Sequence, residues 1–224
     1  MKLVNSVYDI KIDLKENELY TLVLESPTAM KDIVNNLINQ CSGQQGEFVL
    51  ADDDKIQKLD KKCDILLNPF LMDENNKKII SKLYSEMKEI VLQSQSEWFH
   101  VNSEMLRYID SVVDQVPYDN LIYDNEADIE SIFKAYNIKF SLEESIYDKV
   151  LDFIKIEARL LHIDILFMVH FKEYFTEEEL LEIFKIACYN KINLIMIESR
   201  ENNKLMSIDE RCFIIDKDLC TIVK

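Results

Sequence analysis

Five acidic side chains gather in one short segment of the chain. The segment from Tyr118 to Glu130 contains Asp119, Asp124, Glu126 and Asp128 as well as Glu130, and it has no Lys or Arg. Clustered carboxylates suit calcium, a hard cation that takes about 6–8 oxygen ligands. The spacing is not that of an EF-hand, because the segment lacks the turn glycine and the loop length. The residues therefore predict either a calcium site or an ordinary solvated acidic loop.

A second candidate follows a predicted buried strand at residues 19–25. Lys31 lies where a phosphate-binding P-loop places the lysine that neutralises phosphates. Glu25 and Met30, however, stand at the glycine positions of that motif, Asp32 stands at its Ser/Thr position, and Pro27 removes an amide. The residues predict a P-loop-like scaffold that has lost its nucleotide. An ordinary capped helix with a surface lysine is the simpler interpretation of the same residues.

Catalytic side chains do not form a recognisable set. His100, His162 and His170 have no motif neighbours, and the sequence contains no GxSxG or HExxH pattern. Cys188 and Cys212 lie on predicted helix and strand faces that belong to the core. No nucleophile is paired with a base, so we predict a protein that is not an enzyme.

Lysines recur along one predicted helix. Lys77, Lys78, Lys82 and Lys88 lie opposite an apolar stripe, which is typical of a solvated helix face. The same lysines would form a positive lining if an oligomer brought several copies together.

The overall charge argues against simple binding to nucleic acid or to an anionic membrane. Lys+Arg 26 against Asp+Glu 42 gives a formal net charge of −16, whereas such binding usually shows as a basic excess. No apolar run approaches the roughly 18 residues of a membrane span. No signal peptide is evident after Met1, and the five cysteines form no CxxC pair. These features predict a protein of the reducing cytoplasm.

The predicted elements that position these residues alternate between strands and helices. Only two glycines and three prolines occur, too few for the tight turns of a β-sandwich or barrel. Strands are predicted at residues 7–12, 19–25, 48–50, 65–67, 163–169, 194–197 and 213–215, with helices starting at Ser26, Leu142 and Thr176. Their order predicts a parallel or mixed sheet with right-handed crossovers. Between them, helical periodicity runs from about residue 79 to 98, from 105 to 116 and from 129 to 136.

Several stretches resemble one known family. They are Cys63–Leu66, Ile132–Ala135 with Ile138–Lys139, Ser145–Val150, Ile165–Val169 and Leu194–Phe213, the last containing Glu198-Ser199-Arg200-Glu201 and Ile208-Asp209-Glu210. In these stretches the chain resembles the small accessory protein of type II-A CRISPR systems that acts in spacer acquisition, the Csn-two family. The likeness extends over nearly the whole chain and is strongest over roughly the last 95 residues.

The resemblance implies an α/β fold: a P-loop-NTPase-like head with a degenerate nucleotide loop plus an inserted helical leg domain. The head would comprise residues 1–72 and 141–224, and the leg residues 73–140. The resemblance further implies a homotetrameric ring that takes double-stranded DNA ends through a positively charged hole, with calcium at the leg and no bound nucleotide. Partners would be the integrase proteins and the effector nuclease of the CRISPR system.

Within that family, the position of the insertion points to Lys77, Lys78, Lys82, Lys134 and Lys139 as DNA-contacting residues. The chain departs from the family at Ser131, where members place an acid, so Asp128 or Glu130 would have to replace that ligand. Lysines that face the hole reconcile DNA binding with the net charge, because charges are screened over about 10 Å. The alternatives are an acidic protein-interaction module on an inactive P-loop-like scaffold, and an acidic nucleotide-binding regulator.

Overall fold

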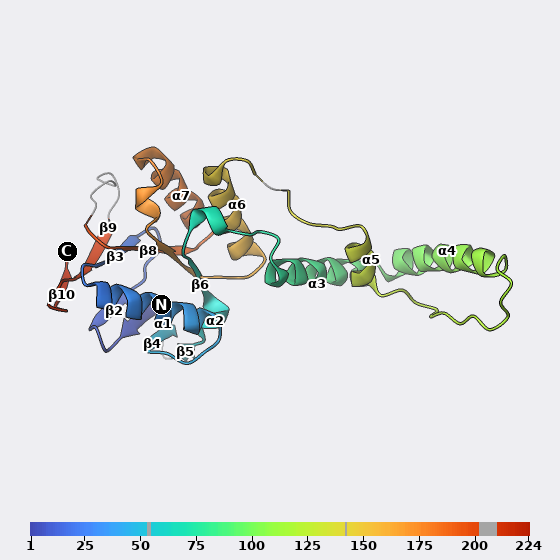
Figure 1. Cartoon of the computed structure of the whole chain (residues 1–224), viewed down its shortest axis with the longest axis horizontal. Coiled ribbons are helices and arrows are strands. Elements are labelled where there is room, and N and C mark those ends of the chain that lie inside the picture. The colour runs from blue at the N-terminus through green and yellow to red at the C-terminus, as the bar shows by residue number, and fades with distance from the viewer. Residues whose placement is uncertain (53–54, 142, 202–209) are drawn as a thin grey trace. The chain divides into compact units, whose positions relative to one another are not determined.

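The structure, a computed structural model, divides the chain into two compact units. It describes residues 1–52, 55–141, 143–201 and 210–224. One unit, which we call the α/β unit, comprises Met1–Glu74 and Leu142–Lys224, and the other, the helical unit, comprises Asn75–Ser141 (Figure 1). The predicted helix start at Leu142, and Ile208 and Asp209 of the family-like segment, lie outside the described residues.

The α/β unit is built on a mixed sheet in the described part of the chain. Its strand order is β10-β9-β3-β8-β7-β6, and every neighbouring pair is parallel except β10 with β9. The strands are β3 (Leu19–Leu24), β6 (Cys63–Leu66), β7 (Ile165–Val169), β8 (Asn193–Glu198), β9 (Glu210–Ile215) and β10 (Thr221–Val223). All residues of β3 and β7 are buried, as expected for apolar strands that are covered on both faces.

Helices cover both faces of this sheet, with α1 on one side and α6 and α7 on the other (Figure 1). They are α1 (Pro27–Cys41), α6 (Ile146–Arg159) and α7 (Glu177–Tyr189). The unit also contains three shorter helices, α2 (Leu59–Lys62), η1 (Pro69–Leu71) and η2 (Phe171–Glu173). The predicted caps define two of the helix starts. Ser26 caps α1, and Thr176 with Glu179 forms the capping box of α7.

A small antiparallel sheet, which the sequence did not predict, completes the α/β unit. Its order is β2-β1-β4-β5, with β1 (Lys2–Asn5), β2 (Ile10–Asp13), β4 (Phe48–Asp52) and β5 (Lys55–Gln57). The strand predicted over residues 7–12 was therefore misplaced. The side chain of Asn5 accepts hydrogen bonds from the backbone amides of Val7 (3.0 Å) and Tyr8 (3.1 Å), which turns these residues out of the strand.

The described residues of the helical unit form three helices: α3 (Lys77–Gln93), α4 (Gln95–Val113) and α5 (Ile129–Ala135). The predicted break after Trp98 was wrong, because the break falls at Ser94. The Ser94 amide bonds to the Val91 carbonyl (3.0 Å), while the Ser94 carbonyl accepts from the amides of Glu97 and Trp98. Ser94 therefore ends α3 and begins α4. No helix in the described residues combines the length and apolarity that crossing a bilayer requires.

Candidate nucleic-acid interface

Two segments of the helical unit carry lysines without any acidic residue. Residues 75–85 contain Lys77, Lys78 and Lys82, and residues 131–141 contain Lys134 and Lys139. Neither segment includes an Asp or a Glu. We call these two ranges the lysine segments. Together they carry all five lysines predicted to contact DNA.

Hydrogen bonds join the two lysine segments, which lie far apart in the sequence. The Asn75 side chain donates to the Phe140 carbonyl (3.1 Å) and accepts from the Phe140 amide (2.9 Å). The buried Tyr84 donates its hydroxyl to the carbonyl of Ile138 (2.9 Å), and its ring lies 5.9 Å from the ring of Phe133. These contacts hold the start of α3 beside the segment that follows α5.

Most of the five lysines keep their charge available to solvent. Lys77, Lys82 and Lys139 are exposed and form no ion pair among the described residues. Lys134 lies 3.9 Å from Glu130 one helical turn away, but its side chain is 61% exposed. A pair of this kind is worth about 0–1 kcal/mol, so Lys134 remains free to exchange its partner for a phosphate.

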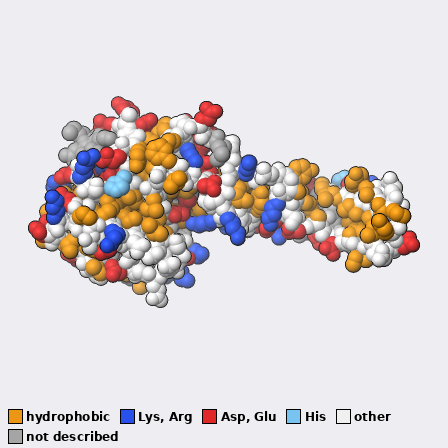
Figure 2. Space-filling model, in the orientation of Figure 1, with side chains coloured by type: hydrophobic (Ala, Val, Ile, Leu, Met, Phe, Trp, Pro, Cys, Tyr) orange, Lys and Arg blue, Asp and Glu red, His pale blue; other side chains and the backbone are white. Residues whose placement is uncertain are grey.

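The rest of the helical unit carries the opposite charge. Between residues 86 and 130, eleven acids outnumber two bases, which gives a local charge of −9. The two lysine segments together carry +5. Figure 2 shows the basic side chains over α3, whereas apolar side chains are prominent over α4. Positive charge is therefore concentrated locally within a strongly acidic chain.

The acids predicted as calcium ligands make other contacts in the structure. Asp119, Asp124 and Glu126 lie in the loop between α4 and α5, where Glu126 accepts a 3.5 Å hydrogen bond from the Trp98 indole. Asp128 caps α5 by accepting from the amide (2.9 Å) and hydroxyl (2.6 Å) of Ser131, and these bonds hold the pKa of Asp128 below its usual value.

Glu130, the last predicted ligand, faces lysines. Its carboxylate lies 3.7 Å from Lys88 and 3.9 Å from Lys134. Among the described residues, no three His, Cys, Asp or Glu side chains come together in a way that could hold a metal ion. The five acids do not form such a group in the described structure, and calcium stays a prediction from the resemblance.

The turn at the degenerate P-loop positions is a regular helix start. The Ser26 hydroxyl accepts from the Ala29 amide (3.5 Å), and Pro27 occupies the first turn. Glu25 and Lys31 are exposed, and Asp32 accepts from the Tyr8 hydroxyl (3.4 Å). These contacts account for the residues as a capped helix. The loss of a nucleotide stays a prediction.

A buried ionic network in the α/β unit was missed by the sequence analysis. Lys172 is buried and pairs with Glu210, which also accepts from Thr21. Glu198 accepts from the Lys172 amide (3.1 Å) and lies 3.6 Å from Nδ1 of His170, and burial raises the pKa of this carboxyl. The only signal in the sequence was Glu198 at the end of an apolar strand. The network ties the ends of β7, β8 and β9 together.

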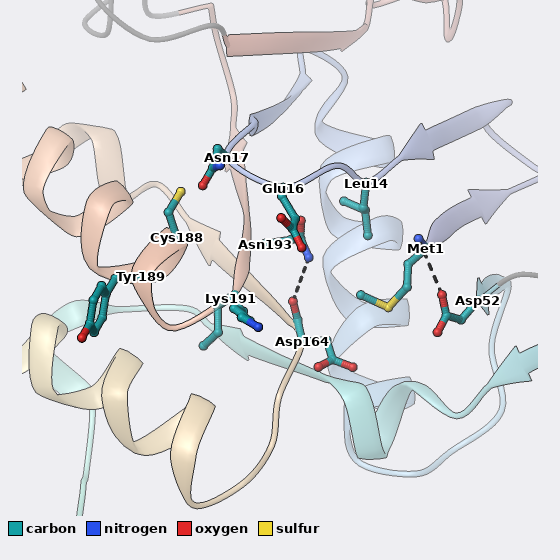
Figure 3. A pocket seen from close by; sticks show the side chains of 11 residues that line it. Met1, Leu14, Glu16, Asn17, Asp52, Asp164, Cys188, Tyr189, Lys191 and Asn193 are labelled. Atoms are coloured by element: carbon teal, nitrogen blue, oxygen red, sulfur yellow. Dashed lines mark hydrogen bonds and ion pairs between the residues drawn. The ribbon is translucent and has the colours of Figure 1, made fainter.

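A cavity of about 470 Å³ also lies in the α/β unit (Figure 3). Two of its carboxylates are already paired, Asp52 with the Met1 amine (3.7 Å) and Asp164 with Lys62 (2.7 Å). Seven of its lining residues lie at or just before the amino-terminal ends of strands: Met1, Glu16, Asn17, Asp164, Lys191, Ile192 and Asn193. The others are Leu14 and Asp52, at the carboxyl ends of β2 and β4, and Cys188 and Tyr189 of α7.

A family comparison identifies the lineage of the chain. The model of the family described as CRISPR-associated protein (Cas_Csn2) matches residues 40–219, which is most of the sequence. The chain belongs to this family. Membership of the Csn2 family supports a role in adaptation by a type II-A CRISPR system. The matched range includes both lysine segments.

One solved structure shares the fold of this chain, and a second gives a weaker match. The crystal structure of Stu0660 of Streptococcus thermophilus superposes with a TM-score of 0.60 at 13% identity, covering 100% of this chain and 76% of that one. The ADP conformation of MJ1267, an ATP-binding cassette of an ABC transporter, gives a TM-score of 0.43 at 13% identity, covering 96% and 82%. Comparison with curated protein sequences gives no match.

Proposed function

We propose that this Csn2 protein is a non-catalytic DNA-binding protein that holds double-stranded DNA ends during spacer acquisition. The observation that carries the proposal is the pair of lysine segments. They bring together Lys77, Lys82 and Lys139, exposed and without ion pairs among the described residues, on a surface with no acid in either segment. Binding of DNA phosphates requires a locally positive surface rather than a positive net charge, because salt screens charges over about 10 Å.

This mode of binding is independent of sequence. Lysine ammonium groups are point charges that contact phosphates, and phosphate contacts fix the position of a duplex without reading its bases. Affinity should therefore fall steeply with salt, with a slope of about 0.9 for each phosphate contacted. The integrase proteins and the effector nuclease remain the proposed partners that receive or supply the DNA.

The proposed homotetrameric ring is supported by α4, which contains no buried residue in the described structure. An isolated helix is marginally stable in water and normally needs a packing partner. Apolar side chains recur on α4 with alternating spacings of three and four, as in a coiled-coil seam, at Trp98, Val101, Met105, Tyr108 and Val112. We call these five residues the α4 seam. A second copy of the same helix is a self-complementary partner for it.

Linear and covalently closed circular duplex of the same sequence distinguish a ring from an open surface. We expect the protein to shift linear duplex in a gel and to leave the closed circle unbound, because a closed circle offers no end to enter a ring. Equal binding to both forms would retain DNA binding and remove the ring. Binding to neither form would contradict the proposed function.

One observation favours a second candidate function. Residues 86–130 combine a charge of −9 with the α4 seam, three of whose five side chains are exposed, and this combination suits docking to a basic protein surface. If neither DNA form binds, a protein-interaction module with no direct DNA role becomes the better account.

A further inference from the structure

Tyr136 is an exposed aromatic residue placed between two of the proposed DNA-contacting lysines. Its side chain is 79% exposed at the end of α5, between Lys134 and Lys139. The segment 131–141 around it contains no acid. We propose that Tyr136 stacks on an unpaired base at a DNA end, so that the surface binds duplex carrying a single-stranded overhang more tightly than blunt duplex. This inference rests on the proposed function.

The turn after α5 directs Tyr136 outward. The Asn137 amide bonds to the Lys134 carbonyl (3.0 Å) and the Ile138 amide to the Phe133 carbonyl (3.2 Å), which folds the chain back at once. Asn137 adopts a φ of +50°, a left-handed conformation that asparagine tolerates better than most residues. Phe133 and Ile138 are drawn towards Tyr84 by the ring contact and hydrogen bond described above, and Tyr136 is left facing solvent.

Two other tyrosines of the helical unit are committed to internal contacts, whereas Tyr108 and Tyr118 are exposed but lie outside the lysine segments. Tyr84 donates its hydroxyl to the Ile138 carbonyl, and Tyr123 donates to Asp110. The Tyr136 side chain has no hydrogen-bond partner among the described residues. Both its hydroxyl and its ring are thus available to a ligand.

An aromatic ring with positive charges on either side indicates which class of ligand Tyr136 would bind. Aromatic side chains beside lysines bind single-stranded nucleic acid, because every base has a face on which a ring can stack. Inside a duplex those faces are covered by neighbouring base pairs. An exposed face is found at an end, above all in an overhang. The phosphates on either side of the stacked base would lie within reach of Lys134 and Lys139.

The test compares blunt duplex with the same duplex carrying a short overhang, for wild type, Tyr136→Ala and Tyr136→Phe. Tyr189→Ala is the matched control, because Tyr189 is also 79% exposed and lies in the α/β unit. Fluorescence anisotropy gives the affinities, and a fluorescent base analogue in the overhang reports stacking through quenching.

We expect wild type and Tyr136→Phe to prefer the overhang and to quench the analogue. Tyr136→Ala should lose about 5- to 100-fold in affinity for the overhang duplex, with blunt binding and salt slope unchanged. If Tyr136→Ala matches Tyr189→Ala on both duplexes, the stacking role is overturned while the proposed function stands. A changed sedimentation coefficient for Tyr136→Ala would likewise overturn it, in favour of a subunit contact. Failure of wild type to bind either duplex overturns both.

Discussion

Duplex affinity should fall about 10- to 100-fold when Lys77→Glu and Lys82→Glu are combined, because two phosphate contacts become two repulsions. Both side chains are exposed on the first lysine segment, and their replacement disturbs no ion pair in the described structure. The loss should be the same for unrelated DNA sequences, and the salt slope should fall by about two. Fluorescence anisotropy over a range of salt concentrations measures both quantities.

The matched control makes the same change of charge at two lysines outside the lysine segments. Lys31→Glu with Lys217→Glu lowers the net charge equally at two exposed lysines of the α/β unit. This control should bind duplex nearly as well as wild type, and both variants should keep the wild-type melting temperature. An equal loss of affinity in the two variants would show that net charge, rather than the lysine segments, governs binding.

The assembly should dissociate when three residues of the α4 seam become acidic. Val101, Tyr108 and Val112 are exposed in a single copy, and Tyr108 is 72% exposed. Burial of each such side chain between two copies contributes about 1.5–3 kcal/mol. Val101→Glu, Tyr108→Glu and Val112→Glu together remove that gain and place unpaired carboxylates in the interface. Sedimentation velocity should show a species smaller than the tetramer that we propose for the wild type.

The control for this variant introduces three glutamates on the same helix, at positions away from the seam. Gln95→Glu, Ser96→Glu and His100→Glu change exposed polar positions of α4. This variant should sediment like wild type. Were the seam variant to remain tetrameric as well, the assembly would have to use other surfaces, and α4 would have no part in it.

Local sequence signals predicted most of the α/β unit because they act over a few residues. Thr176 and Glu179 are three apart, and they form the predicted reciprocal cap at 2.8 and 3.3 Å. The strands at 19–24 and 165–169 are apolar on both faces and lie inside the sheet. Short edge strands such as β5 and β10 were missed, since three residues give no period to detect.

The candidate interface was only half predictable. Helical spacing indicated that Lys77 and Lys82 face solvent, but it gave no information about what lies beside them. Their neighbourhood depends on the bonds between Asn75 and Phe140, residues 65 apart in the sequence. The acidic loop shows the converse: proximity in the sequence suggested a metal site, yet Asp128 is used as a helix cap and Glu130 pairs with lysines.

Lysine acylation in the absence and presence of linear duplex, read by mass spectrometry, tests the interface in the unmodified protein. DNA should protect Lys77, Lys82 and Lys139 from the reagent and leave Lys31 and Lys217 as reactive as in the free protein. Protection should disappear at high salt, because the contacts are with phosphates. If duplex binds while the lysine segments remain fully reactive, the helical unit is not the DNA-binding surface.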